Sequence, residues 1–157
     1  MPKHQGGITM NSRKIHTAAF MAYCALMLWL LFDRPGYTPG IPYWEQVAGQ
    51  LNLVPFRTLW LFAGLLDSPH PEYVRAAVIN LGGNIFLFIP IGYFLPRLWP
   101  FLRNFFSFLL ACTMSIVLVE LLQLVTLLGS LDIDDLILNL FGMLVGCVLF
   151  MIFRERR

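Results

Sequence analysis

The stretch VELLQLVTLLGSLDIDDLILNLFGMLVG (119–146) decides the fold, because two apolar runs meet there at a short break, GSLD (129–132). A membrane-spanning helix needs about 20 mostly apolar residues, and each run reaches that length with its neighbours. The stretch therefore predicts two spanning helices joined by a turn. It also carries carboxylates and amides at unexpected places. They are Glu120, Gln123, Asp132, Asp134, Asp135 and Asn139.

The composition of the whole chain agrees with a membrane protein. The 157 residues are 58% hydrophobic and only 13% charged, with a mean hydropathy of +0.70. A soluble domain carries more charge, because its surface faces water. The net charge of +2 and the absence of a basic stripe argue against nucleic-acid binding. The three cysteines show no metal or disulfide spacing, so we expect free, buried thiols.

Four segments are long and apolar enough to span, at about 15–32, 75–95, 102–127 and 134–153. We therefore predict an all-α, four-helix membrane bundle, formed by a single domain over 15–153. A basic tail precedes it at 1–14, and another follows at 154–157. Ser68 is a candidate N-cap for the second helix.

The segment 47–66 is ambiguous, because it is long enough to span but contains Asn52, Pro55 and Arg57. With four spans and cytoplasmic termini, eight Lys and Arg residues lie inside and three outside. A fifth span would place Arg97, Arg103 and the C-terminal arginines outside, against the positive-inside tendency. We therefore predict a short interfacial or re-entrant helix over 47–66, on the outer side of the membrane.

This topology brings polar pairs from three helices to the outer half of the membrane. Helical spacing places each pair on one helix face. The pairs are Asn80 with Asn84, Glu120 with Gln123, and Asp135 with Asn139. Arg75 lies near the start of the second helix and is a further candidate for the site. We therefore predict an outward-facing polar pocket.

Glycines in the same helices predict close packing. Gly142 and Gly146 form a small-xxx-small pattern that permits two helices to approach. Gly82 and Gly83 suggest a second place where a neighbouring backbone comes near.

Glu120 is the carboxylate that is hardest to explain by structure alone. A charge at membrane depth is costly unless it is paired or protonated, and such residues are candidates for function. The alternative is a hydrogen-bonded anchor to Asn80, Asn84 or Asn139. Asp132 and Asp134 are expected mainly to cap the last helix. Glu120 with Asp135 is a weak candidate for a divalent metal site. No motif for a nucleophile, a cofactor or a metal is found, so we expect no cofactor.

The order of these motifs resembles the VanZ-like family of bacterial membrane proteins over roughly residues 50–147. The resemblance rests on Asn52-Leu-Val-Pro-Phe56, Asn80, Gly83-Asn84, Phe88, Pro90, Gly92, Glu120, Gln123, the acidic turn 132–135, Asn139, Gly142 and Gly146. One departure is Gly129, near which the family commonly has an arginine. The resemblance implies a link with resistance to the glycopeptide antibiotic teicoplanin, and it implies no settled catalytic activity.

Three hypotheses follow. The favoured one is a non-catalytic protein that binds a lipid-linked cell-wall or envelope molecule in the outward pocket and lowers glycopeptide susceptibility. The second is a membrane enzyme acting on such a lipid, with Glu120 as general acid or base. In the third, the polar cluster only sets helix register and function lies with a partner protein. The sequence leaves the ligand and the oligomeric state open.

Overall fold

The computed structural model describes residues 10–33 and 36–155, and of residues 10–12 and 155 only the backbone. Four long helices are long and apolar enough to cross a membrane, which confirms the predicted all-α membrane bundle. They are α1 (Met10–Phe32), α4 (Pro71–Leu98), α5 (Phe105–Thr126) and α6 (Ile133–Glu155). Parts of the predicted tails at 1–9 and 156–157 lie outside the described residues, and α1 begins five residues before the predicted span at 15.

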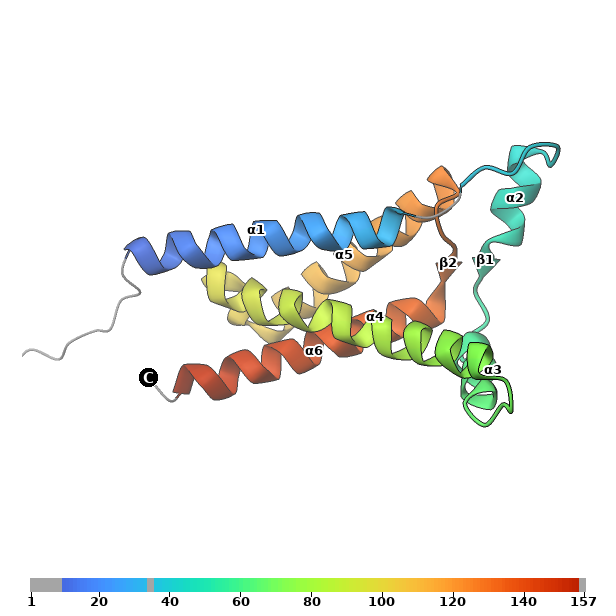
Figure 1. Ribbon diagram of the computed structural model, residues 1–157. Coiled ribbons are helices and arrows are strands. Elements are labelled where there is room, and N and C mark those ends of the chain that lie inside the picture. Colours follow the sequence, from blue (N-terminus) through green and yellow to red (C-terminus); the bar gives the residue numbers. More distant parts are fainter. Residues whose placement is uncertain (1–9, 34–35, 156–157) are drawn as a thin grey trace, which may run out of the picture.

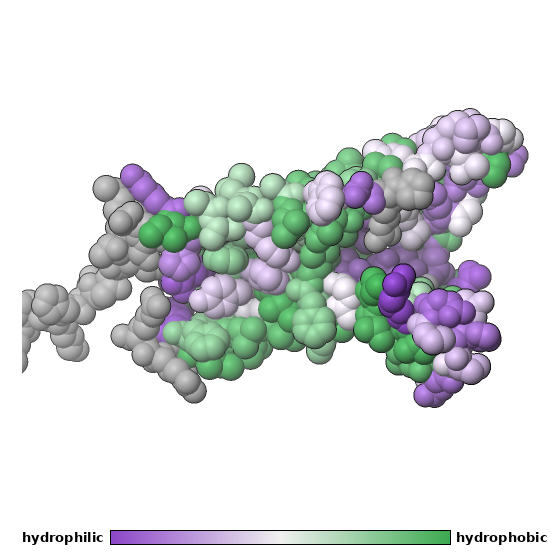
Figure 2. All heavy atoms as spheres, viewed as in Figure 1, coloured by the Kyte–Doolittle hydropathy of each residue, from purple (hydrophilic) through white to green (hydrophobic). Residues whose placement is uncertain are grey.

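The start of α1 and the end of α6 lie at one end of the bundle, which we call the termini end (Figure 1). The opposite end carries the short elements between α1 and α4 and the acidic turn between α5 and α6, and we call it the acidic end (Figure 1). Hydrophilic residues gather at both ends, while the middle is mostly apolar (Figure 2). Large side chains in that middle are exposed, such as Phe86 at 72% and Leu110 at 65%. This distribution suits a bundle whose flanks contact lipid.

Helices α4 and α6 form the most extensive helix pair, and glycines set their separation. A Cβ added at Gly142 would lie 2.2 Å from the carbonyl oxygen of Ile85, and one at Gly146 would lie 2.0 Å from that of Ile89. Gly92 of α4 meets the backbone of Met143 in the same way. The predicted close packing at Gly142 and Gly146 is confirmed.

The expectation for Gly82 and Gly83 is wrong. A Cβ at Gly82 would meet only the side chain of Phe86, and one at Gly83 would meet nothing within 4 Å. Both lie nearer the start of α4 than Gly92, outside its close contact with α6.

The predicted single helix over 47–66 is instead two short helices, α2 (Tyr43–Gly49) and α3 (Arg57–Leu65). Between them, β1 (Leu51–Asn52) pairs in parallel with β2 (Leu131–Asp132), and the Leu131 N–H donates to the Gln50 carbonyl at 3.0 Å. Pro55 has no N–H to continue a helix, and Phe56 takes a positive φ of 66°. These two residues break the segment.

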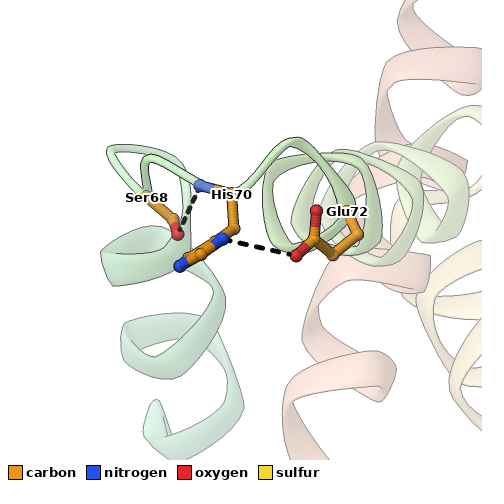
Figure 3. A network of polar contacts seen from close by, with 3 residues as sticks. All are labelled: Ser68, His70 and Glu72. Atoms are coloured by element: carbon orange, nitrogen blue, oxygen red, sulfur yellow. Dashed lines mark hydrogen bonds and ion pairs between the residues drawn. The ribbon is translucent and has the colours of Figure 1, made fainter.

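The connection into α4 differs from expectation at Ser68. Pro71 occupies the first turn of α4 and His70 is its N-cap residue, without a side-chain cap. The Ser68 hydroxyl accepts a hydrogen bond from the His70 N–H at 3.2 Å, before the helix begins (Figure 3). The imidazole of His70 also lies 3.5 Å from the carboxylate of Glu72, and both side chains are exposed (Figure 3).

The remaining contacts tie α1 to the bundle and start α5. The Tyr23 hydroxyl of α1 donates to the carbonyl of Leu87 on α4. A short 3₁₀ helix, η1 (Pro100–Arg103), follows α4, and the Asn104 side chain then caps α5 by accepting from the Ser107 N–H at 3.2 Å.

Candidate functional site: the acidic end

Asp134 is fully buried, and its carboxylate binds the start of α3 rather than its own helix. It accepts backbone N–H groups from Phe56 at 2.6 Å, Thr58 at 2.8 Å and Leu59 at 3.1 Å. The first amides of any helix lack partners within it, and α3 has no cap of its own. A carboxylate from α6 therefore supplies both the hydrogen bonds and the negative charge that a helix N-terminus favours.

Asp132 joins the same segment through side chains. Its Oδ2 accepts from the Asn52 amide at 3.0 Å and from the Thr58 hydroxyl at 2.6 Å. Its Oδ1 accepts from the Asp134 N–H at 2.8 Å, at the start of α6. Asp132 thus caps α6 as the sequence suggested, while Asp134 does not. We call the contact of Asp132 and Asp134 with residues 52–59 the aspartate clasp.

Glu120 supports this clasp from α5. It is 5% exposed, and its Oε2 accepts a hydrogen bond from the Asp132 N–H at 3.3 Å. It also borders a cavity of about 180 Å³. The lining residues are Leu53, Val117, Glu120, Leu131, Asp132, Ile133 and Leu136. Glu120 is therefore next to the acidic turn, and its cavity is otherwise lined by apolar residues and Asp132.

A second and larger pocket, of about 380 Å³, opens between α3, α4 and α6. It unites four of the candidate residues, namely Arg75, Asn80, Asn84 and Asp135. Its other lining residues are Phe62, Glu72, Ala76 and Ile79. We call it the Arg75 pocket. The Asn84 amide donates to the Asp135 carboxylate across the two helices. The Oδ1 atom of Asn80 is buried and lacks a hydrogen-bond partner.

The other two candidates contribute elsewhere. Gln123 is buried and donates to the Leu31 carbonyl at 3.0 Å, which ties α5 to the end of α1. Asn139 is 3% exposed and its Oδ1 has no hydrogen-bond partner, but it does not line the Arg75 pocket. A Cβ at Gly129 would lie 3.0 Å from the Gln123 side chain, so a larger residue there presses on that amide.

The polar residues therefore divide into two groups instead of forming one pocket. Glu120 and Asp135, the weak metal candidates, border different cavities. Among residues 10–33 and 36–155, no group of three or more His, Cys, Asp or Glu side chains is placed to hold a metal ion.

Sequence reasoning missed Thr58 and the backbone amides of 56–59 as partners of the acidic turn. Asn52 and Phe56 were named only as part of the Asn52–Phe56 motif that carries the family resemblance, without a predicted partner. No local signal identifies these contacts, because their partners lie more than 70 residues away. Asn52 and Pro55 did signal that the segment would break.

Comparison with protein-family models matches residues 20–154 to the model described as VanZ/LLP1. No curated protein matches the chain, and no solved structure matches it. The matched range includes both groups of polar residues and all four long helices, apart from the first half of α1 and the last residue of α6.

Proposed function

The chain belongs to the VanZ/LLP1 family, and from that premise we propose that it binds a lipid-linked cell-wall or envelope molecule in the Arg75 pocket. By holding such a molecule it lowers the susceptibility of the cell to teicoplanin. In this proposal the protein crosses the bacterial cytoplasmic membrane with both termini in the cytoplasm, and it acts without catalysis.

The composition of the Arg75 pocket carries the proposal. One guanidinium, two carboxylates and two amides line it together with Phe62 and Ile79. A ligand with a polar headgroup beside an apolar chain meets both kinds of partner there. The unpaired Oδ1 of Asn80 supports a donor on the ligand, such as a sugar hydroxyl or an amide, because a buried acceptor without a partner is costly.

The distribution of charge supports the proposed orientation. Described basic residues at the termini end are Arg13, Lys14, Arg97, Arg103 and Arg154. At the acidic end the described arginines are Arg57 and Arg75. Loops with excess Lys and Arg face the cytoplasm. The Arg75 pocket then opens at the outer surface, where lipid-linked wall precursors are used.

Cysteine labelling tests this orientation. With Cys24, Cys112 and Cys147 replaced by alanine, single cysteines at Ser130 and Asn104 are exposed to an impermeant maleimide on intact cells. We expect labelling at position 130 and none at position 104 until the membrane is opened. Labelling of position 104 in intact cells contradicts the orientation.

Susceptibility tests the binding role. In a teicoplanin-sensitive host, expression of the chain is expected to raise the inhibitory concentration. Arg75→Gln and Asn80→Leu are expected to abolish that rise at equal membrane abundance. Arg57→Gln removes an exposed arginine outside the pocket and is the matched control. Retained resistance in both pocket variants contradicts the proposal. Lipids that copurify with the wild type and not with Asn80→Leu identify the ligand.

The cavity beside Glu120 favours a second candidate, a membrane enzyme in which this carboxylate transfers a proton. A buried carboxyl group facing apolar side chains is a recurrent form of general acid. Glu120→Gln keeps the size of the side chain and the oxygen that accepts from Asp132, but it cannot exchange a proton. Full resistance in Glu120→Gln excludes this candidate. Loss of resistance with unchanged thermal stability supports it over the binding role.

A further inference from the structure

Three arginines gather at the termini end, on elements far from the acidic end. Arg97 lies in the last turn of α4, Arg103 ends η1, and Arg154 lies in the last turn of α6. Two aromatic rings connect them. Tyr93 and Phe150 pack edge to face with ring centroids 6.2 Å apart. We call this group the arginine–aromatic cluster.

The rings hold two of the guanidinium groups in place. Arg97 lies 5.7 Å from the centroid of the Tyr93 ring, and Arg103 lies 5.8 Å from that of Phe150. Arg97 also donates to the Tyr93 hydroxyl at 3.2 Å, and the Arg103 Nε donates to the Pro96 carbonyl at 3.0 Å. Stacking and hydrogen bonding restrict these long side chains, so less entropy is lost when they bind a ligand.

Among the described side chains, no carboxylate forms an ion pair with Arg97, Arg103 or Arg154. Eight of the nine carboxylate side chains lie between Asp33 and Asp135, at the acidic end or in the half of α5 nearest to it, and only Glu155 is close in sequence to the cluster. The Arg97 Nε is buried and has no hydrogen-bond partner. Burial and the charge of Arg154 both lower the pKa of Arg103, so these two arginines repel each other. A bound anion reduces this repulsion between the two arginines.

The surroundings favour an anion that belongs to the membrane. Exposed apolar side chains border the cluster along the chain, among them Phe101 at 65%, Phe153 at 53% and Ile152 at 44%. Arg97, Arg103 and Arg154 lie at or just beyond the ends of long apolar helices, where the hydrocarbon core of a membrane gives way to headgroups. A soluble anion makes no use of these apolar neighbours, whereas the acyl chains of a lipid do.

We propose that the arginine–aromatic cluster is a binding site for the phosphate of an anionic glycerophospholipid in the leaflet at the termini end. Arg97, Arg103 and Arg154 neutralise the phosphate from three different elements. The bound lipid then joins the ends of α4, η1 and α6. This site is independent of the Arg75 pocket, which lies at the opposite end.

Trp99 offers a reporter, because it precedes η1 and is 40% exposed, while Trp29, Trp44 and Trp60 lie toward the acidic end. The experiment uses the full chain with those three tryptophans changed to phenylalanine, in neutral detergent micelles. Phosphatidylglycerol with brominated acyl chains is titrated, and quenching of Trp99 is followed. Brominated phosphatidylcholine is the neutral comparison, and inorganic phosphate is the soluble competitor.

We expect saturable quenching by phosphatidylglycerol at concentrations where phosphatidylcholine quenches weakly. Arg97→Gln and Arg103→Gln should each weaken apparent affinity about fivefold, the effect of about one charge near a membrane surface. Arg→Lys at the same positions keeps the charge and should lose less. Arg57→Gln, at the acidic end, should change nothing, and thermal melts verify that each variant is folded.

Two results overturn the proposal. Equal quenching by the two lipids means that Trp99 meets only the general lipid surface. Displacement of phosphatidylglycerol by millimolar inorganic phosphate means that the cluster is a site for soluble phosphate.

Discussion

Helix α6 is held in two places by opposite means. At its start, carboxylates of Asp132 and Asp134 bind backbone amides and polar side chains of residues 52–59 through hydrogen bonds. Farther along, Gly142 and Gly146 lie against the backbone of α4 with no polar side chain involved. The glycine contact depends on the absence of atoms, whereas the aspartate clasp depends on the presence of particular ones. Substitutions should therefore affect the two places in different ways.

The largest effect is expected at the glycine contact. In Gly146→Val the new Cβ falls 2.0 Å from the Ile89 carbonyl oxygen, so α4 and α6 must separate. We expect a loss of about 3 kcal/mol or more in unfolding free energy, or failure to accumulate in the membrane. Denaturant titration in micelles measures it. Gly83→Val is the matched control, since nothing lies within 4 Å there. Equal stability of the two variants contradicts the close contact.

A substitution in the aspartate clasp should lower the unfolding free energy by less than Gly146→Val does, and its structural effect should be local. Asp134→Ala leaves the N–H groups of Phe56, Thr58 and Leu59 without their carboxylate. We expect the unfolding free energy to fall by about 2 kcal/mol. The loss is limited because water can hydrogen-bond to part of this segment once it detaches. Amide hydrogen exchange should accelerate at 56–59 and stay unchanged in α4. Asp67→Ala, on an exposed loop, is the control. Unchanged exchange at 56–59 would mean that α3 does not need this cap.

Removal of a single polar contact outside the clasp and the glycine contact should lower the unfolding free energy less than Asp134→Ala does. Gln123→Leu removes the hydrogen bond to the Leu31 carbonyl while keeping most of the side-chain volume. We expect a loss of about 1 kcal/mol, the usual size for a hydrogen bond between membrane helices. Denaturant titration measures it. A loss as large as that of Asp134→Ala would show that the end of α1 matters as much as the clasp.

The exposed pair of His70 and Glu72 should show the smallest effect. The two groups lie 3.5 Å apart and both side chains are more than 60% exposed (Figure 3). We expect Glu72→Gln to change the unfolding free energy by no more than about 0.5 kcal/mol, because water and salt screen such pairs. Thermal melts at low and high salt verify this.

The two places also differ in how well they are predicted from sequence. The glycine contact follows from a spacing of four on one helix, and the long apolar runs identify the spans. Helix lengths and charge bias also bring the polar residues to one end. These inferences use local patterns, and the structure confirms the bundle and the packing at Gly142 and Gly146.

The clasp could not be predicted, because Asp134 binds backbone amides that every sequence contains. Which amides are left without partners depends on where α3 starts, and that depends on Pro55 and the positive φ of Phe56. The same limit applies to the polar pairs. Their depth followed from helix length, but the direction each faces depends on helix rotation, which places Asp135 in one pocket and Glu120 beside another.

The aspartate clasp also determines the order in which native contacts form during synthesis and membrane insertion. Residues 50–59 leave the ribosome long before Asp134, which follows Phe56 by 78 positions. During that interval the amides at the start of α3 have no carboxylate to bind, and this segment must wait in water or among headgroups. Only after α5 and the start of α6 have been inserted can it dock. This segment, which follows α1 and α2 in the chain, is therefore among the last to acquire its native contacts.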